Sequence, residues 1–290
     1  MMSWCVQCRI ANVVIQVDGD TAACQKDMWK FLKLYEQVEA QQPDLCFSIS
    51  YKQGVYDFTC TIAEREPMLL WSSVDDREVS AALEIHFYTQ FIQYLYAERN
   101  ILSIHSAVLG VGNRAVMFAG VSGAGKSSIC TAGLLSGAAY LSDEFTLLAQ
   151  DGQVFPFPRP MQWEYKEHPA FDREKIENTG LIVSDYFDFP DTQGEIARCY
   201  LWHPQDIQRE PLNLTHIILH QYDGTLDKAM LTSIPRHEAL VALPQHLHVQ
   251  AGMAKDLPLL NRRIDKNCVF YRLHFPNVFE AWKLLENEVF

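Results

Sequence analysis

The residues with the clearest chemical role form the segment Gly120-Val-Ser-Gly-Ala-Gly-Lys-Ser127, which matches the pattern G-x-x-x-x-G-K-[ST] at every fixed position. Glycines let successive backbone N–H groups turn inward around phosphate oxygens, and a following helix directs its positive N-terminal end at the same anion. We expect Lys126 to reach the β- and γ-phosphates of ATP and the Ser127 hydroxyl to ligate Mg²⁺. The expected nucleotide-binding residues are Gly120, Ser122, Gly123, Ala124, Gly125, Lys126, Ser127 and Ser128.

The flanks of this segment support a phosphate-binding loop. An apolar run at residues 115–119 predicts a strand before it, and residues 127–136 predict a helix after it. The motif has little meaning outside a strand–loop–helix context. The alternative is a glycine-rich turn that precedes a helix by chance, and the correct flanks favour the phosphate loop.

Two further features lie close to this loop in the sequence. Asp143 and Glu144 follow a short predicted strand at residues 138–141, and His105 lies on the predicted strand 102–109. Adjacent carboxylates at a strand end can divide two tasks, one accepting a proton from an attacking hydroxyl and the other holding Mg²⁺. The alternatives are a solvent-exposed cap for the acidic pair and a buried, hydrogen-bonded strand histidine for His105.

In this order and spacing, residues 104–146 resemble the catalytic core of the HPr kinase/phosphorylase superfamily. That core has a histidine on the strand before the loop, then G-x-S-G-x-G-K-S, a short helix and a Leu-x-Asp-Asp-like motif, here Leu141-Ser-Asp-Glu144. The chain is similar in particular to HPr kinase-like proteins outside sugar regulation. Some of these phosphorylate serine on peptides, including tailoring kinases associated with lasso-peptide biosynthesis.

The resemblance implies a Mg²⁺- and ATP-dependent kinase that acts on a hydroxyl, usually of serine. By position, Asp143 is the catalytic base, Glu144 stands where the family has a second Asp that assists the metal, and His105 lies beside the base. Asp-Glu in place of Asp-Asp is a departure from the family pattern. The stretch that the bifunctional relatives use for phosphorolysis has no counterpart here.

The motifs do not identify the phosphate acceptor, and they leave two roles open for one further cation, Arg159. A serine of a peptide or protein is the expected acceptor, with a free small-molecule alcohol or a regulatory ATPase without an acceptor as alternatives. Arg159 is the only charge in the proline-rich segment 153–160, and related kinases often have a basic residue in a comparable place. It is either a catalytic cation that neutralises the transferring phosphoryl group or a surface arginine.

The hydrophobic pattern predicts an α/β protein with a P-loop kinase core of the HPr kinase type and an N-terminal α+β region. We expect the boundary at residues 98/99, with region 1–98 serving substrate recognition and region 99–290 catalysis. The predicted N-terminal elements are strands 12–17, 44–51, 55–62 and 68–72 and helices 23–39 and 76–99.

The C-terminal half has a less regular pattern of apolar residues. Prolines make 153–160 an extended segment rather than a central strand, and the polar segment 165–192 predicts a long irregular insertion. Pro244-Gln-His-Leu-His248 has two histidines, but no further ligand cluster supports a metal there, so it is interpreted as a loop. The predicted elements beyond these are strands 198–202, 214–220 and 270–275 and helices 235–243, 254–263 and 277–288.

Composition and charge limit the classes of partner that the protein is expected to bind. A net charge of −12 argues against nucleic acid and against an anionic membrane surface as the main partner. Eight scattered cysteines and the lack of a transmembrane or signal pattern predict a reduced, cytoplasmic protein. The resemblance adds an expectation of homo-oligomers, because relatives are often oligomeric.

Overall fold

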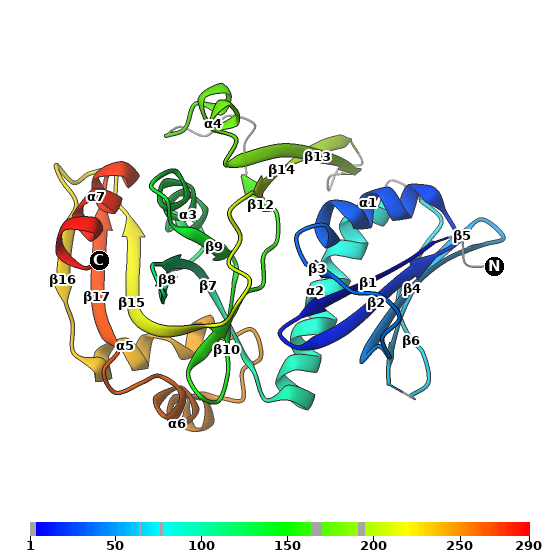
Figure 1. Ribbon diagram of the computed structural model, residues 1–290, viewed down its shortest axis with the longest axis horizontal. Coiled ribbons are helices and arrows are strands. Elements are labelled where there is room, and N and C mark those ends of the chain that lie inside the picture. The colour runs from blue at the N-terminus through cyan, green and yellow to red at the C-terminus, as the bar shows by residue number, and fades with distance from the viewer. Residues whose placement is uncertain (1–3, 64, 76–77, 164–169, 191–194) are drawn as a thin grey trace. The chain divides into compact units, whose positions relative to one another are not determined.

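The computed structural model describes residues 4–63, 65–75, 78–163, 170–190 and 195–290. These residues form seven α-helices and several β-sheets, so the chain is a mixed α/β protein (Figure 1). They divide into two compact units. Unit 1 is Met1–Tyr94, Gln162–Lys166 and Ser184–His203, and unit 2 is Leu95–Met161, Glu167–Val183 and Pro204–Phe290.

Unit 1 is built on a six-stranded sheet of order β3-β1-β2-β4-β5-β6, with α1 and α2 beside it. A smaller sheet has the order β12-β14-β13. The elements are β1 (Trp4–Ile10), β2 (Val13–Gly19), α1 (Ala22–Leu32), β3 (Glu36–Gln37), β4 (Leu45–Lys52), β5 (Val55–Ile62), β6 (Met68–Ser73), α2 (Val79–Arg99), β12 (Met161–Trp163), β13 (Ile182–Pro190) and β14 (Ile196–Pro204).

Aromatic packing joins α2 to the larger sheet. The ring of Phe87 on α2 lies 5.0 Å from that of Phe47 on β4, which stacks on Phe58 of β5 at 5.7 Å. Strands β4 and β5 form an antiparallel hairpin whose turn residues, Gln53 and Gly54, both have positive φ. The predicted N-terminal strands and the long helix are therefore confirmed within a few residues at their ends.

Unit 2 contains an eight-stranded sheet of order β11-β10-β7-β8-β15-β17-β16, in which β9 also pairs with β7. Strands β8, β15 and β17 are parallel neighbours. The elements are β7 (Leu102–Val111), β8 (Arg114–Ala119), α3 (Lys126–Leu135), β9 (Ala139–Ser142), β10 (Phe145–Leu148), β11 (Gln153–Phe155), α4 (Arg173–Thr179), β15 (Leu212–Tyr222), β16 (Met230–Ser233), α5 (Arg236–Ala242), α6 (Met253–Arg263), β17 (Val269–Phe275) and α7 (Val278–Glu288).

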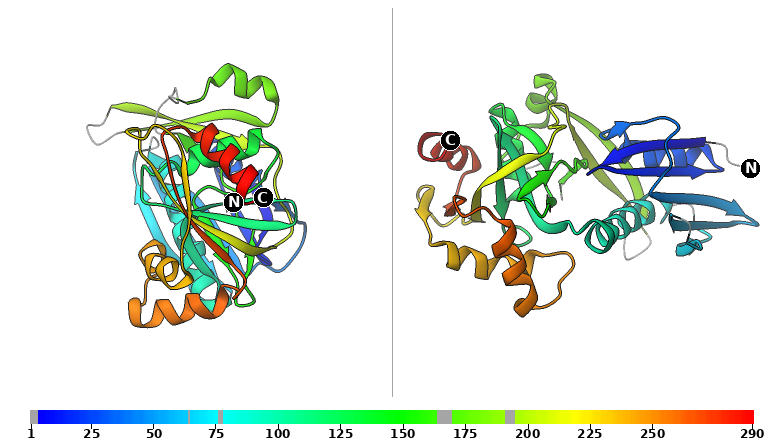
Figure 2. Two further views of the ribbon diagram at one scale, coloured as in Figure 1. Left: turned by 90° about the vertical axis from the view of Figure 1, so that its left-hand side faces the viewer. Right: turned by 60° about the horizontal axis from the view of Figure 1, so that its bottom comes forward.

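Helices cover both faces of this sheet. On one face Ile104, Met117 and Ile217 pack in one cluster with Leu240 of α5 and Leu260 of α6. On the other, α3 and α7 pack together, away from α5 and α6 (Figure 2). Strand β8, which leads into the glycine-rich loop, therefore lies in a sheet that is buried on both faces. Its buried position fixes where the loop begins.

The close approach of α3 to the sheet depends on a glycine. A Cβ at Gly133 would lie 2.5 Å from a methyl of Leu109 and 2.7 Å from the indole of Trp282. No Cβ atom tolerates contacts that short, so only glycine lets α3 lie this close to β7 and α7. This packing fixes the C-terminal half of α3 against β7 and α7.

Several predictions about the elements were wrong. The helix predicted for 23–39 ends at Leu32, because Glu36–Gln37 pairs with β1 and the Gln37 side chain donates to the carbonyl of Leu32. Strands β1, β3, β10, β12 and β16 were missed. In the segment 153–160, residues 153–155 form β11, which pairs with both β10 and β15, because the prolines begin only at Pro156. The segment 165–192 contains α4 and β13 rather than irregular structure, apart from residues 165–169 and 191–192, which lie outside the described residues.

Candidate active site

The glycine-rich loop connects β8 to α3, and two of its glycines have left-handed backbones. Gly123 has φ 78° and Gly125 has φ 95°, a region that other residues rarely adopt. A Cβ at Gly120 would lie 2.8 Å from both the Ala124 methyl and the His220 carbonyl oxygen. The fixed glycines of the motif are therefore required by conformation or contact.

The first turn of α3 starts without a side-chain cap at Gly125. The first N–H groups of a helix have no partner within the helix, so this end is suited to an anion. Ala124 packs beneath the loop, whereas Ser122 and Gly123 are exposed at its tip. Ser127 and Ser128 lie on the first turn and are half-buried.

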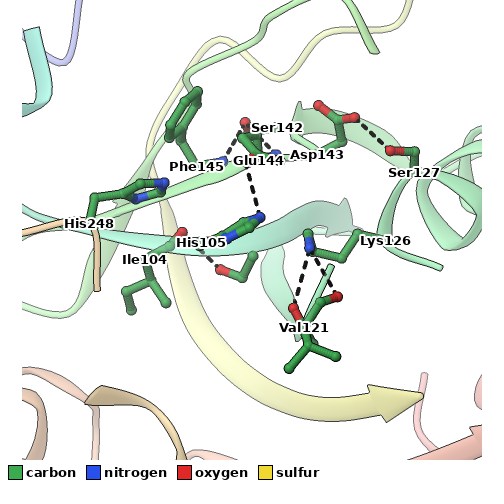
Figure 3. Close-up of polar contacts among 12 residues, drawn as sticks. Ile104, His105, Val121, Lys126, Ser127, Ser142, Asp143, Glu144, Phe145 and His248 are labelled. Atoms are coloured by element: carbon green, nitrogen blue, oxygen red, sulfur yellow. Dashed lines mark hydrogen bonds and ion pairs between the residues drawn. The ribbon is translucent and has the colours of Figure 1, made fainter. Parts of the chain in front are cut away.

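Lys126 is buried against its own loop. Its ammonium donates to the carbonyl oxygens of Gly120 at 3.2 Å and Val121 at 3.4 Å (Figure 3). Burial lowers the pKa of Lys126, and the nearby carboxylates of Glu144 and Asp143 act in the opposite direction. A phosphate at the loop would give this cation a stronger partner than two neutral carbonyls.

Asp143 and Glu144 form a bend between β9 and β10 at the edge of β7. Ser142 lies opposite Val108 and Phe145 opposite His105, so the register is kept across the bend. The Ser142 hydroxyl causes the bend locally, because it accepts the N–H groups of Glu144 at 3.3 Å and Phe145 at 3.0 Å. The backbone that carries the two carboxylates is therefore held in a fixed position next to β7.

The Asp143 carboxylate contacts the glycine-rich loop. The Ser127 hydroxyl donates to its Oδ2 at 3.0 Å, and the Tyr140 hydroxyl donates to its Oδ1 at 3.0 Å (Figure 3 shows the former). Burial raises the pKa of Asp143 to about 6, although Arg159 and these two hydroxyls lower it. This is a buried carboxylate whose ionised form a cation would stabilise.

Glu144 turns to His105 instead. Its Oε1 lies 3.0 Å from Nε2 of His105, and both side chains are about one-third exposed, at 30% and 34%. Burial alone would raise the pKa of Glu144, but the hydrogen bond from His105 and the charge of Arg159 outweigh it, and the pKa is lowered. The carboxylate is therefore held in its ionised form.

Arg159 is half-buried in the extended segment after β11. Its guanidinium lies 5.7 Å from the ring centroid of Phe145, and its backbone carbonyl oxygen lies 2.9 Å from the Tyr140 hydroxyl, as a second acceptor for the single proton that Tyr140 directs to Asp143. Its charge acts on the pKa values of both Asp143 and Glu144. Arg159 therefore belongs to the electrostatic environment of the acidic pair.

Every residue singled out in the sequence lies in unit 2, around the end of β8 and the β9–β10 bend. The pairing of the two carboxylates is the reverse of the one that the resemblance implies, because Ser127 meets Asp143 and His105 meets Glu144. Two contributors were missed. Tyr140 carries no motif, and His248 was visible only as one half of the His-x-His segment.

His248 follows a short 3-10 helix, Pro244–His246, and lies beside His105, with ring centroids 5.6 Å apart. The acidic residue after β15, Asp223, is instead engaged by Thr225 in a turn.

Comparison with protein-family models and with curated proteins found no match to this chain. Among the described residues, no helix has the length and apolar character needed to cross a membrane.

Proposed function

We propose that this protein is an ATP- and Mg²⁺-dependent kinase that transfers the γ-phosphoryl group to a hydroxyl, with a serine of a peptide or protein as the acceptor. The observation that carries the proposal is the 3.0 Å hydrogen bond from Ser127 to Asp143. It joins the glycine-rich loop to an acidic pair whose other member is held by a histidine. A phosphate loop alone is common to many nucleotide-binding proteins, whereas this combination suits transfer to an acceptor.

The residues present fit a nucleotide polyphosphate. The left-handed glycines and the uncapped start of α3 suit an anion, and Lys126 is buried within reach of the same loop. The proposed role of Lys126 is to exchange its two carbonyl partners for phosphate oxygens. Arg159 would add positive charge on the side of the acidic pair.

The fit to Mg²⁺ rests on Ser127 and Asp143. A serine hydroxyl and a carboxylate are the oxygen ligands that this hard cation takes from proteins, together with water and phosphate oxygens. Burial raises the pKa of Asp143 to about 6, and a bound cation would offset this cost of ionisation. When bound, Mg²⁺ supplies neutralisation of the charge on the β- and γ-phosphates.

The geometry favours Glu144 rather than Asp143 for the acceptor side. Asp143 uses one oxygen on Ser127 and the other on Tyr140. Glu144 contacts His105 through Oε1 alone. The lowered pKa of Glu144 keeps its carboxylate ionised. We assign Glu144 to accept the hydroxyl proton and His105 to position it. A weak base suffices, because phosphoryl transfer depends mainly on positioning and charge neutralisation.

The test is a transfer assay. The full chain is incubated with γ-labelled ATP and Mg²⁺ in the presence of candidate serine-containing peptides and hydroxylated metabolites, and mass spectrometry identifies the labelled product. Labelling of a peptide serine by the wild type, absent in Lys126→Ala, supports the proposal. Labelling of a free metabolite alone would show that the acceptor is a small-molecule alcohol rather than a peptide serine. ATP hydrolysis without any labelled acceptor indicates a regulatory ATPase and contradicts the kinase.

A further inference from the structure

We propose that His105, Glu144 and His248 form a binding site for a divalent transition-metal ion of the zinc class. One candidate ligand atom from each side chain lies within 4.8 Å of the other two. The three residues come from separate segments: β7, the β9–β10 bend and the stretch after the 3-10 helix. Figure 3 shows them gathered along β7. This site needs no nucleotide, but it shares His105 and Glu144 with the proposed acceptor side, so a bound ion would occupy the proposed base.

The spacing already approaches that of a metal centre. His105 Nε2 and Glu144 Oε1 are 3.0 Å apart. Two ligands on a tetrahedral zinc ion, each bound at about 2.1 Å, lie about 3.4 Å from each other. These two atoms therefore need only a small adjustment. The third ligand lies no more than 4.8 Å away, so a shift of roughly 1.4 Å completes the set.

The position of His248 is fixed by several contacts within unit 2. Leu247 forms a β-bridge with Ile104, and the His248 N–H donates to the Ser103 carbonyl at 3.0 Å. The His248 ring also lies 4.9 Å from that of Phe145. These contacts hold the His248 side chain beside β7, as a metal ligand must be held.

Ser103 also prepares the ring of His248. Its hydroxyl lies 3.0 Å from Nδ1, which leaves Nε2 as the nitrogen available to a metal. A ligating histidine usually has its other ring nitrogen hydrogen-bonded to the protein, because that bond fixes the orientation and the tautomer. The Ser103–His248 contact is of this kind.

The donor set selects the class of ion. Two imidazoles and one carboxylate suit Zn²⁺, Co²⁺, Ni²⁺ or Fe²⁺, whereas Mg²⁺ prefers oxygen ligands alone. Because His248 is exposed, positions remain open to water, as in zinc sites with two histidines and a glutamate. The charges of Lys126 and Arg159 act on Glu144 and oppose a second cation, so binding is weaker than in closed structural zinc sites.

The experiment titrates Co²⁺, a coloured substitute for Zn²⁺, into the metal-free full chain without nucleotide. Wild type is expected to bind one equivalent with visible absorption that Zn²⁺ abolishes. His248→Ala is expected to weaken binding at least about tenfold, as is Glu144→Gln. His237→Ala, an exposed histidine on α5, is the matched control and is expected to bind like wild type.

Three results would overturn the site. They are no visible band in the wild type, equal affinity in wild type and His248→Ala, or an equal loss in His237→Ala and His248→Ala. Circular dichroism of each variant shows whether the fold is retained. Because His248 is exposed, its substitution leaves the core intact, and the Co²⁺ affinity of that variant decides the question.

Discussion

The Ser127 hydroxyl donates a 3.0 Å hydrogen bond to Oδ2 of Asp143. Ser127 belongs to the first turn of α3 and Asp143 to the bend between β9 and β10, so this bond joins two segments that each hold one half of the proposed chemistry. The next residue, Glu144, is turned to His105.

Substitution of the two carboxylates separates their roles. Asp143→Asn is expected to raise the Mg²⁺ concentration needed for half-maximal transfer at least about tenfold, because it removes the charged ligand. Glu144→Gln is expected to lower the maximal rate about 10²- to 10⁴-fold, with little change in that Mg²⁺ concentration. Rates measured across a Mg²⁺ titration test both. The reverse pattern would return the base assignment to Asp143.

Lys126→Ala removes the buried cation of the glycine-rich loop. A hydrogen bond to a charged group contributes about 1.5–3 kcal/mol. ATP affinity is therefore expected to fall roughly 10- to 150-fold, as measured by calorimetry. Lys283→Ala on α7 is an exposed control and is expected to bind ATP like wild type. Equal ATP affinity in Lys126→Ala and wild type is incompatible with the phosphate-binding loop.

The conformation of the loop is tested by two glycine substitutions. Gly125→Ala and Gly137→Ala both place a side chain at positive φ, 95° and 89°, so both are expected to destabilise the fold by about 1 kcal/mol or more. The Cβ added at position 125 would also lie 3.1 Å from the ring of Phe275, whereas the Cβ added at position 137 would have no atom within 4 Å. Only Gly125→Ala is expected to weaken ATP binding. Thermal unfolding and calorimetry of both variants check this, and equal ATP affinities would contradict it.

The raised pKa of Asp143 predicts a pH-dependent stability. Burial raises the folded-state pKa from 3.8 to about 6, so its neutral form is favoured in the fold. The contribution to stability is fully present below about pH 4 and is lost as the pH rises through 6. Asp143→Asn stays neutral, so without metal its unfolding free energy relative to wild type is expected to rise by about 2 kcal/mol between pH 4 and 7. Urea titrations at both pH values measure the difference, and a constant difference would contradict the raised pKa.

Tyr140→Phe removes a hydroxyl that stabilises ionised Asp143. The hydrogen bond from Tyr140 lowers the pKa of Asp143, so its loss is expected to raise that pKa above about 6. The carboxyl carbon shift of Asp143, followed by NMR against pH, reports the midpoint. Tyr271→Phe on β17 is the control and is expected to leave the midpoint unchanged. A midpoint at or below that of wild type in Tyr140→Phe would exclude this role.

Most elements of the fold were predictable because their signals are local. The glycine pattern located the loop, and apolar periodicity located α2, α7 and the buried strand β15. Asn100 and Gly137, which follow the ends of α2 and α3, both have positive φ. Strand β3 was missed because it consists of two exposed residues that form a strand only by pairing with β1, and no local pattern in the sequence records that pairing.

The sequence by itself determined which residues are candidates for the chemistry: a glycine-rich loop, an acidic pair and a histidine on the preceding strand. Only the tertiary structure decided which of them meet. The register of β9 and β10 on β7 sends Asp143 to Ser127 and Glu144 to His105, and the bridge at Leu247 brings His248 beside them. These contacts join residues far apart in the chain, and they depend on strand register and on one serine-stabilised bend, which spacing in a sequence does not fix.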